Sequence, residues 1–189
     1  MCGRYYIEFD EEALQGIAGE IEKKIEDYPG QITIKTGGEI FPADIVPVQT
    51  GINRYEAMKW GFVSFTGKPL INARSETAFE KPMFREAMRE RRCLIPASGY
   101  YEWSKERGKK TKFRFHLPDQ PMYFAGCYRK ERSNPLYHFV ILTQEATNGI
   151  KVIHHRMPVI IRPEHFDLWL HDGRRAMEYA AQDLLYEGA

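Results

Sequence analysis

Short β-rich segments separated by turn residues are the feature that most constrains the fold of this chain. Apolar, β-branched and aromatic residues gather in short runs bounded by Gly, Pro, Asn and Asp, which is the pattern of strands joined by turns. The expected strands are Ile32–Thr36, Ile45–Gln49, Tyr55–Trp60, Cys93–Pro96, Gly99–Trp103, Lys112–His116, Met122–Tyr128, His138–Thr143 and Val159–Ile161. Since long helical segments do not alternate with these strands, the pattern indicates an α+β fold rather than a regular βαβ sheet.

Helical periodicity is confined to a few places. Residues 11–28 repeat apolar side chains at helical spacing, and Pro29 ends the pattern. Residues 84–92 predict a short basic helix, and a last helix is expected after Pro163. A length of 189 residues fits one domain better than two, so we expect a single compact domain over residues 1–189.

The overall charge gives no sign of a nucleic-acid partner. The formal net charge is +1, so any DNA site must be a local patch of the surface. The N-terminus lacks the apolar stretch of a secretory signal, and no apolar run is long enough to span a membrane. The three cysteines lie far apart and form no CxxC pair, which argues against a zinc ribbon. We expect a cytoplasmic protein with reduced thiols, acting as a monomer.

Cys2 has unusual chemical potential because of its position. Aminopeptidases remove Met1 when the second side chain is small, which would leave a thiol and an α-amine on adjacent carbons. An α-amine has a pKa near 7.7–8.0, so about a tenth of it is free base at pH 7, far more than for lysine. Such a residue attacks an aldehyde to form an imine, and its thiol then closes a five-membered thiazolidine. Position alone favours a plainer reading, in which Cys2 is a small buried residue at the start of a strand.

Other polar and aromatic residues stand in settings that suit catalysis or DNA binding. Asn72 and Arg74 alternate with apolar residues and are expected on one side of an extended segment, where they could hold an aldehyde oxygen and a phosphate. Taken alone, the pattern favours a turn-forming asparagine and a solvated arginine. Glu102 lies between Tyr101 and Trp103, which suits proton transfer, although an exposed strand glutamate fits the pattern equally.

Two histidines and two tryptophans complete the candidates. His154 and His155 point to opposite faces of an extended chain, which argues against a shared metal ion. Trp60 and Trp103 are candidate platforms for unpaired bases, although tryptophans more often belong to the core.

Ordered motifs resemble one family along most of the chain. They read MCGRYY, WGF, NARSET, FREA, RRCLIPASGYYEW, LT at 142–143 and HHRMP, in this order. This series is similar to the SRAP family, named for SOS response-associated peptidase, whose members process abasic sites. The resemblance implies a compact α+β domain with a largely antiparallel, barrel-like sheet and peripheral helices. It also implies single-stranded DNA as the partner, a thiazolidine crosslink to the abasic site, and an association with the nucleoid after damage.

The resemblance assigns roles residue by residue. Cys2 would be the nucleophile, and Asn72 would orient either the cysteine or the sugar. Glu102 would be the base, and His154 would be the acid that opens the sugar. The DNA channel would be lined by Pro42, Trp60, Arg74, Trp103 and Arg156, with Thr143 supporting the site from behind. No metal or organic cofactor is implied. The family usually carries Asp where this chain has His155, and it continues further beyond the last helix, so we expect a short C-terminal end.

Two other functions fit the same residues. Cys2 could be the nucleophile of an amide hydrolase, with its own α-amine as the base. A passive module for single-stranded DNA would need the aromatic and basic residues but not Cys2.

Overall fold

The computed structural model describes residues 2–8, 32–106, 109–118, 120–132 and 134–189. Its strands are β1 (Tyr5–Ile7), β2 (Gly38–Ile40), β3 (Ile45–Gly51), β4 (Arg54–Trp60), β5 (Asn72–Arg74), β6 (Arg92–Ala97), β7 (Gly99–Glu106), β8 (Lys109–His116), β9 (Met122–Lys130), β10 (Tyr137–Glu145), β11 (Arg156–Pro158) and β12 (Leu185–Gly188). Its helices are α2 (Ser75–Ala78), α3 (Pro82–Glu90), α4 (Asn148–Lys151), α5 (Phe166–His171) and α6 (Gly173–Ala176), with 3₁₀ turns at Pro163–His165 and Met177–Tyr179.

Five strands close into a barrel. The order is β10, β4, β3, β6 and β9, and β9 then pairs with β10 again. Neighbouring strands of the ring are antiparallel except β10 and β4, which run parallel. Closure removes the free strand edges that an open sheet would expose. The expected α+β domain with a largely antiparallel, barrel-like sheet is therefore confirmed.

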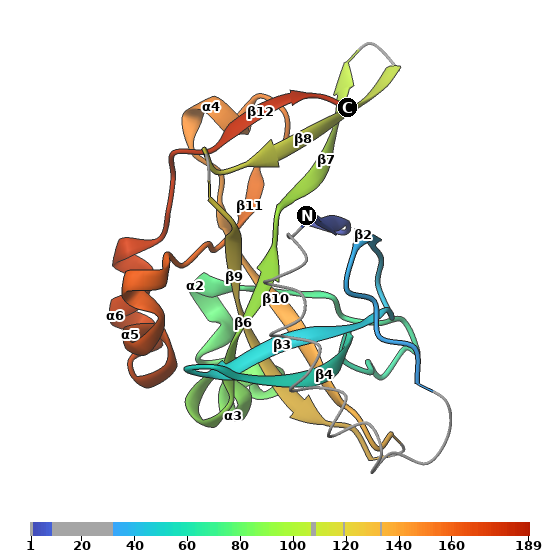
Figure 1. Cartoon of the computed structure of the whole chain (residues 1–189), viewed down its shortest axis with the longest axis vertical. Helices are drawn as coiled ribbons and strands as arrows, with labels where there is room; N and C mark the ends of the chain where they lie inside the picture. Colours follow the sequence, from blue (N-terminus) through green and yellow to red (C-terminus); the bar gives the residue numbers. More distant parts are fainter. Residues whose placement is uncertain (1, 9–31, 107–108, 119, 133) are drawn as a thin grey trace.

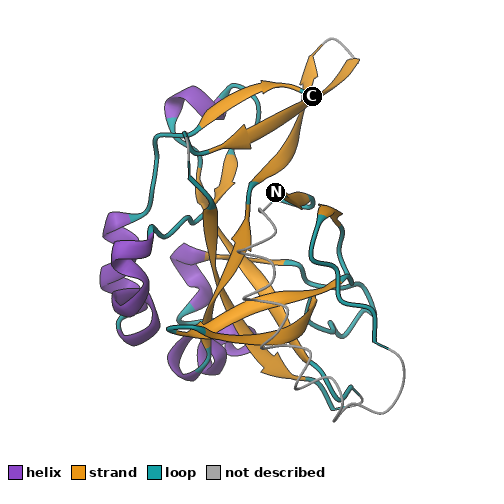
Figure 2. Ribbon diagram, viewed as in Figure 1, coloured by secondary structure: helices purple, strands orange, loops and turns teal. Residues whose placement is uncertain are grey.

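A second sheet lies against the barrel and carries the N-terminus. Its order is β12, β8, β7, β1 and β2, and all of its pairings are antiparallel. β1 lies between β7 and β2, and in Figure 1 it stands where this sheet meets the barrel. Figure 2 shows the helices gathered mainly on the opposite side of the barrel. Because the helices lie elsewhere, residues from several strands of both sheets can meet at this junction.

The barrel interior is the main core, and its packing follows from strand alternation. Tyr5, Trp60, Phe124 and Phe139 are fully buried in one cluster, and the Trp60 and Phe139 rings stack with centroids 6.3 Å apart. A second cluster lies under the helices, where α3 contributes Phe84, Ala87 and Met88 at helical spacing.

Most of the expected elements are confirmed, and two strands are corrected. Residues 32–36 form no strand, and the backbone bond found there joins the Lys35 N–H to the Ile45 carbonyl. At the other end β11 covers Arg156–Pro158 rather than Val159–Ile161. Val159 bonds to both β9 and β10, so these residues insert between two strands instead of extending one ladder. The helix expected over residues 11–28 lies outside the described residues.

The helix after Pro163 is confirmed as a 3₁₀ turn followed by α5, and the basic helix as α3, which begins at Pro82. None of the helices in the described part of the chain has the length and apolar character that crossing a membrane requires.

Candidate active site

Cys2 and Asn72 are joined directly at the junction of the two sheets. The Asn72 Nδ2 donates a hydrogen bond of 2.8 Å to the Cys2 carbonyl. Asn72 opens β5, and Ala73 is buried while Arg74 is exposed, so Asn72 and Arg74 share one side of the strand as expected. Cys2 itself has no exposed surface, and its Sγ lies 4.0 Å from the Arg4 carbonyl. Asn72 therefore fixes the backbone of the residue that carries the thiol.

Glu102 and His154 face each other in the same region. Oε1 of Glu102 lies 3.9 Å from Nδ1 of His154, and Glu102 is only 4% exposed. Alternation along β7 turns Glu102 inward beside Tyr100, while Tyr101 and Trp103 point to the other face. The aromatic neighbours of Glu102 in sequence thus point to the opposite face, where Tyr101 is buried and Trp103 is partly exposed.

His154 is oriented by local backbone contacts. It lies just before β11, and its Nδ1 is 3.0 Å from both the backbone N and the carbonyl O of Arg156. Its ring stacks on that of His155, with centroids 4.6 Å apart. His155 is exposed, and the neighbouring His154 lowers the pKa of its imidazole. His154 is therefore the histidine of the pair that reaches the buried carboxylate.

The Cys2 thiol is held in its neutral form. Burial raises its pKa well above the usual range, and the Glu102 carboxylate raises it further. A thiolate nucleophile needs the opposite setting, with nearby positive charge that lowers the pKa. The site therefore suits chemistry that begins at the nitrogen of Cys2 rather than at its sulfur.

The outer face of β7 combines aromatic rings with cations. Trp103 is partly exposed, with the Arg4 guanidinium 5.2 Å and the Lys110 ammonium 4.9 Å from its ring centroid. Arg4 also lies 4.3 Å from the ring of Phe41, which precedes the partly exposed Pro42. This arrangement of ring faces and positive charge suits unpaired bases and phosphates. Arg4 and Phe41 were not predicted from the sequence; the pairing of β1 with both β7 and β2 brings them to this face.

Arg74, Thr143 and Arg156 lie on neighbouring strands. Arg74 pairs in register with Thr143 and is exposed, with no ion pair to any other described residue. Arg156 is mostly buried, and its guanidinium binds both carboxylate oxygens of Glu76, at 2.6 and 2.9 Å, as well as the Thr143 carbonyl. A phosphate would have to displace Glu76 to reach Arg156, whereas Arg74 is accessible. Thr143 is fully buried behind them, and its role stays a prediction.

Trp60 is not a stacking platform, which corrects the sequence-based expectation. It has no exposed surface, and its Nε1 donates a 3.0 Å hydrogen bond to the Ile71 carbonyl. Pairing of Phe139 with Trp60 between β10 and β4 directs the indole into the barrel. Because Ile71 precedes Asn72, Trp60 instead supports the strand that holds the Cys2 carbonyl.

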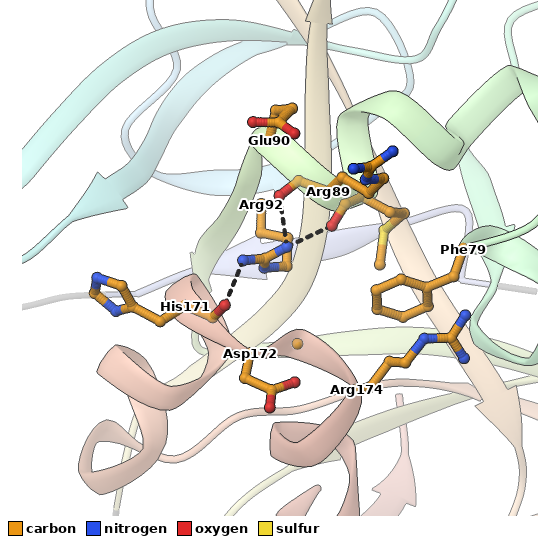
Figure 3. A pocket seen from close by; sticks show the side chains of 9 residues that line it. Phe79, Arg89, Glu90, Arg92, His171, Asp172 and Arg174 are labelled. Carbon is orange, nitrogen blue, oxygen red and sulfur yellow. Dashed lines mark hydrogen bonds between the residues drawn. The ribbon is translucent and has the colours of Figure 1, made fainter.

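A separate hollow lies at the far side of the barrel (Figure 3). It is lined by Phe79, Met88, Arg89, Glu90, Arg92, His171, Asp172, Gly173 and Arg174. The Arg92 guanidinium donates hydrogen bonds to carbonyls at the ends of α3 and α5, among them Met88 and Leu170. Arg92 therefore caps two helix ends, which is a structural use of a residue from the basic segment 84–92.

No group of three or more His, Cys, Asp or Glu side chains in the described part of the chain is arranged to hold a metal ion. The candidate site is made up of Cys2, Asn72, Glu102 and His154. The side chains of Trp103, Arg4 and Phe41, together with Arg74, are the neighbouring candidate DNA-binding residues.

Comparisons with known proteins agree on one family. The sequence profile of the SOS response associated peptidase (SRAP) family matches residues 1–188. The chain is 37% identical over 144 residues to the abasic site processing protein YoaM of Bacillus subtilis. This alignment covers 70% of this chain and 63% of YoaM. It is 31% identical over 193 residues to the abasic site processing protein YedK of Escherichia coli, covering 96% of this chain and 86% of that one.

A solved structure of a protein from Bacteroides thetaiotaomicron has the same fold. Its TM-score is 0.77 at 20% identity, with 99% of this chain and 91% of that chain covered. The match to YoaM spans less than two thirds of the length of that relative. The profile match over nearly all residues, together with the identity to YedK, shows that this chain belongs to the SRAP family.

Proposed function

We propose that this chain binds single-stranded DNA and captures abasic sites covalently through Cys2. The observation that carries the proposal is the convergence of Asn72 on the Cys2 carbonyl and of His154 on Glu102 at one junction. Two relatives, YoaM and YedK, are named abasic site processing proteins, which supports the same assignment.

The reaction follows from the chemistry of an N-terminal cysteine. Removal of Met1 frees the α-amine of Cys2, and His154 acts as the acid that helps open the deoxyribose to its aldehyde. Glu102 takes a proton from the amine, whose nitrogen then bonds to the aldehyde carbon, and loss of water gives an imine. The thiol adds across the C=N bond, its proton passes to the nitrogen, and a thiazolidine results. One water leaves, and no oxidant or reductant is consumed.

DNA would run over the outer face of β7 toward Cys2. Trp103 would stack on an unpaired base, a contact worth about 1–3 kcal/mol. Arg74 and Arg4 would hold phosphates, and Pro42 would lie at the edge of the path beside Phe41. Because the net charge is only +1, we expect a shallow dependence of affinity on salt. Since stacking on Trp103 needs splayed bases, unpaired DNA should bind more tightly than duplex.

The alternative of a cysteine peptidase fits the site less well. Its nucleophile would be the Cys2 sulfur, and burial together with Glu102 raises the pKa of that thiol. Attack that begins at the nitrogen needs no thiolate, so the site favours imine formation.

The test mixes Met-processed protein with a labelled single strand that carries one abasic site. We expect a slowly migrating band that survives heating on a denaturing gel, and no such band with an intact strand. Cys2→Ala should bind the strand but form no band. A missing band with wild-type protein would refute capture, and binding without a band would identify a passive module. Release of a peptide in the same samples, followed by mass spectrometry, would point to the peptidase.

A further inference from the structure

Two buried tyrosines share a cluster with Cys2, and their hydroxyls have no hydrogen-bond partner among the described residues. Tyr5 on β1 and Tyr100 on β7 are directly opposite each other in the antiparallel pair, and neither side chain has exposed surface. Neither hydroxyl has a partner within the described part of the chain. Buried polar groups in proteins are nearly always paired, because an unpaired hydroxyl loses the hydrogen bond that water supplies in the unfolded chain. Phenylalanine would fill both positions without that loss.

Packing directs both rings toward the same part of the interior. The Tyr5 ring packs edge-on against Phe124, with centroids 5.6 Å apart, and the Tyr100 ring packs edge-on against the same Phe124 at 6.2 Å. Tyr100 is held further by stacking on Phe115, with centroids 4.8 Å apart. The rings are therefore fixed, and their hydroxyls cannot swing to solvent.

The two tyrosines lie close to the residues proposed to react with the abasic site. Cys2 belongs to the same buried cluster as both tyrosines, and Glu102 follows Tyr100 by two residues on the same face of β7. A charge on the Cys2 sulfur would raise the pKa of both phenols, which places the thiol within their electrostatic reach. Asn72 Oδ1, on the side chain that binds the Cys2 carbonyl, is also buried without a partner among the described residues.

Closure of the thiazolidine ring requires stabilisation of charge on the Cys2 sulfur. When the thiol adds to the imine, a bond forms between sulfur and carbon and the C=N electron pair moves to nitrogen, which takes up the thiol proton. Because the thiol is neutral at rest, its proton must pass to the imine nitrogen before the S–C bond is complete. Sulfur therefore carries negative charge transiently, in a buried place beside the Glu102 carboxylate. Preorganised O–H donors stabilise such charge without moving.

We propose that Tyr5 and Tyr100 form a pair of hydroxyl donors for the Cys2 sulfur during closure of the thiazolidine ring. The inference rests on the proposed function and deepens it, because it assigns residues to the second covalent step rather than to the first. The unpaired hydroxyls of the resting protein are then groups held ready for the transition state.

The experiment compares Tyr5→Phe, Tyr100→Phe and the double variant with wild-type protein, all Met-processed. Borohydride reduction traps the imine, and resistance to heat without reduction reports the closed ring, so the two steps are timed separately. Tyr123→Phe is the matched control, since that ring packs against Phe166 on the helix side of the barrel.

We expect imine formation within about twofold of wild type in every variant, since the amine and its base are intact. Closure should slow by about tenfold to a hundredfold in the double variant, the range for loss of a charge-stabilising donor. The melting temperature should be equal or higher, because an unpaired buried hydroxyl has been removed.

Three outcomes would overturn the inference. They are closure at the wild-type rate, equal slowing of imine formation and closure, and a lower melting temperature in the Phe variants but not in Tyr123→Phe. The last would mean that the hydroxyls have a structural partner. Absence of both adducts in wild-type protein would instead refute the proposed function itself.

Discussion

Nδ1 of His154 lies 3.9 Å from Oε1 of Glu102, although Glu102 belongs to one sheet and His154 to the segment that leads into a strand of the other. Glu102 is on β7 of the five-stranded sheet, and His154 precedes β11, which pairs with β10 of the barrel. An acid and a base held this close can serve successive proton transfers at one bound sugar. Two substitutions should separate their roles.

Glu102→Gln should slow crosslinking by about 10²–10⁴-fold at pH 7, the usual effect of losing one positioned proton-transfer group. Raising the pH toward the α-amine pKa of about 7.7–8.0 should partly restore the rate, because more amine is then free without help. The measurement is single-turnover crosslinking between pH 6 and 9. A rate that stays low across this range would exclude Glu102 as the base for the amine.

His154→Ala should lose a similar factor but gain nothing from high pH, because ring opening still lacks its acid. DNA affinity should barely change, since neither His154 nor Glu102 is proposed to hold a phosphate. His155→Asp is the matched control and should keep activity, because His155 is exposed beside the site. Full activity of His154→Ala with loss in His155→Ala would move the acid by one residue.

Cys2→Ser should reach the imine and stop there. The α-amine remains, but an oxygen in place of sulfur closes a far less stable ring, so borohydride should trap an adduct that heat destroys. The check is a gel run with and without reduction. A heat-stable adduct in Cys2→Ser would show that the covalent link does not depend on the thiol.

The sequence predicted the four catalytic candidates but not their packing. Alternation in Gly99–Trp103 shows that Glu102 and Trp103 lie on opposite faces, yet both faces carry aromatic residues, so the pattern cannot say which one is buried. The register with β8 decides it, because Phe113 lies opposite Glu102 and Lys112 opposite Trp103. Because Lys112 is charged, the face of β7 that carries Trp103 is the outer one.

Trp60 shows a different limit of sequence reasoning. Its burial depends on the parallel pairing of β4 with β10, a contact between segments far apart in the chain. The local sequence MKWGF contains no sign of this pairing, so from the sequence alone Trp60 could equally face solvent. The carboxylates Glu39 and Glu76 were missed for the same reason, since their cationic partners Arg4 and Arg156 are far away in the sequence.

Acid should destabilise the fold through His138. This side chain is 3% exposed, its Nδ1 lies 2.7 Å from the Gly61 carbonyl, and burial lowers the pKa of its imidazole below the usual value. The unfolded chain takes up a proton near pH 6.5 while the folded chain does so only at lower pH, so stability falls as the pH drops below about 6.5.

His138→Asn should remove this loss, because an amide can still donate to the Gly61 carbonyl but does not titrate. Urea unfolding at pH 7.5, 6.5 and 5.5 measures the difference, with the exposed His171→Asn as the control. Equal acid sensitivity of wild-type protein and His138→Asn would assign the effect to other groups.

Glu39 should weaken DNA binding at the face that Trp103 occupies. Its carboxylate binds Lys112 Nζ at 2.6 Å and Arg4 Nη1 at 3.2 Å, and these contacts, with Lys112 foremost, lower its pKa. A DNA phosphate that approaches Arg4 or Lys112 meets this negative charge as a competitor. Glu39→Gln should therefore raise the affinity for an intact single strand by about fivefold at low salt, equivalent to about 1 kcal/mol for a partly exposed charge.

The salt dependence of the same variant tests the mechanism. If the freed cations each gain a phosphate, the plot of log affinity against log salt should steepen by about 0.7 per added contact. Glu80→Gln is the control, because Glu80 pairs with Arg174 beside Phe79 in a similar group on the helix side of the barrel. Binding titrations at several salt concentrations provide both quantities. Weaker binding by Glu39→Gln, with Glu80→Gln unchanged, would mean that Glu39 positions Arg4 and Lys112 for DNA instead of competing with it.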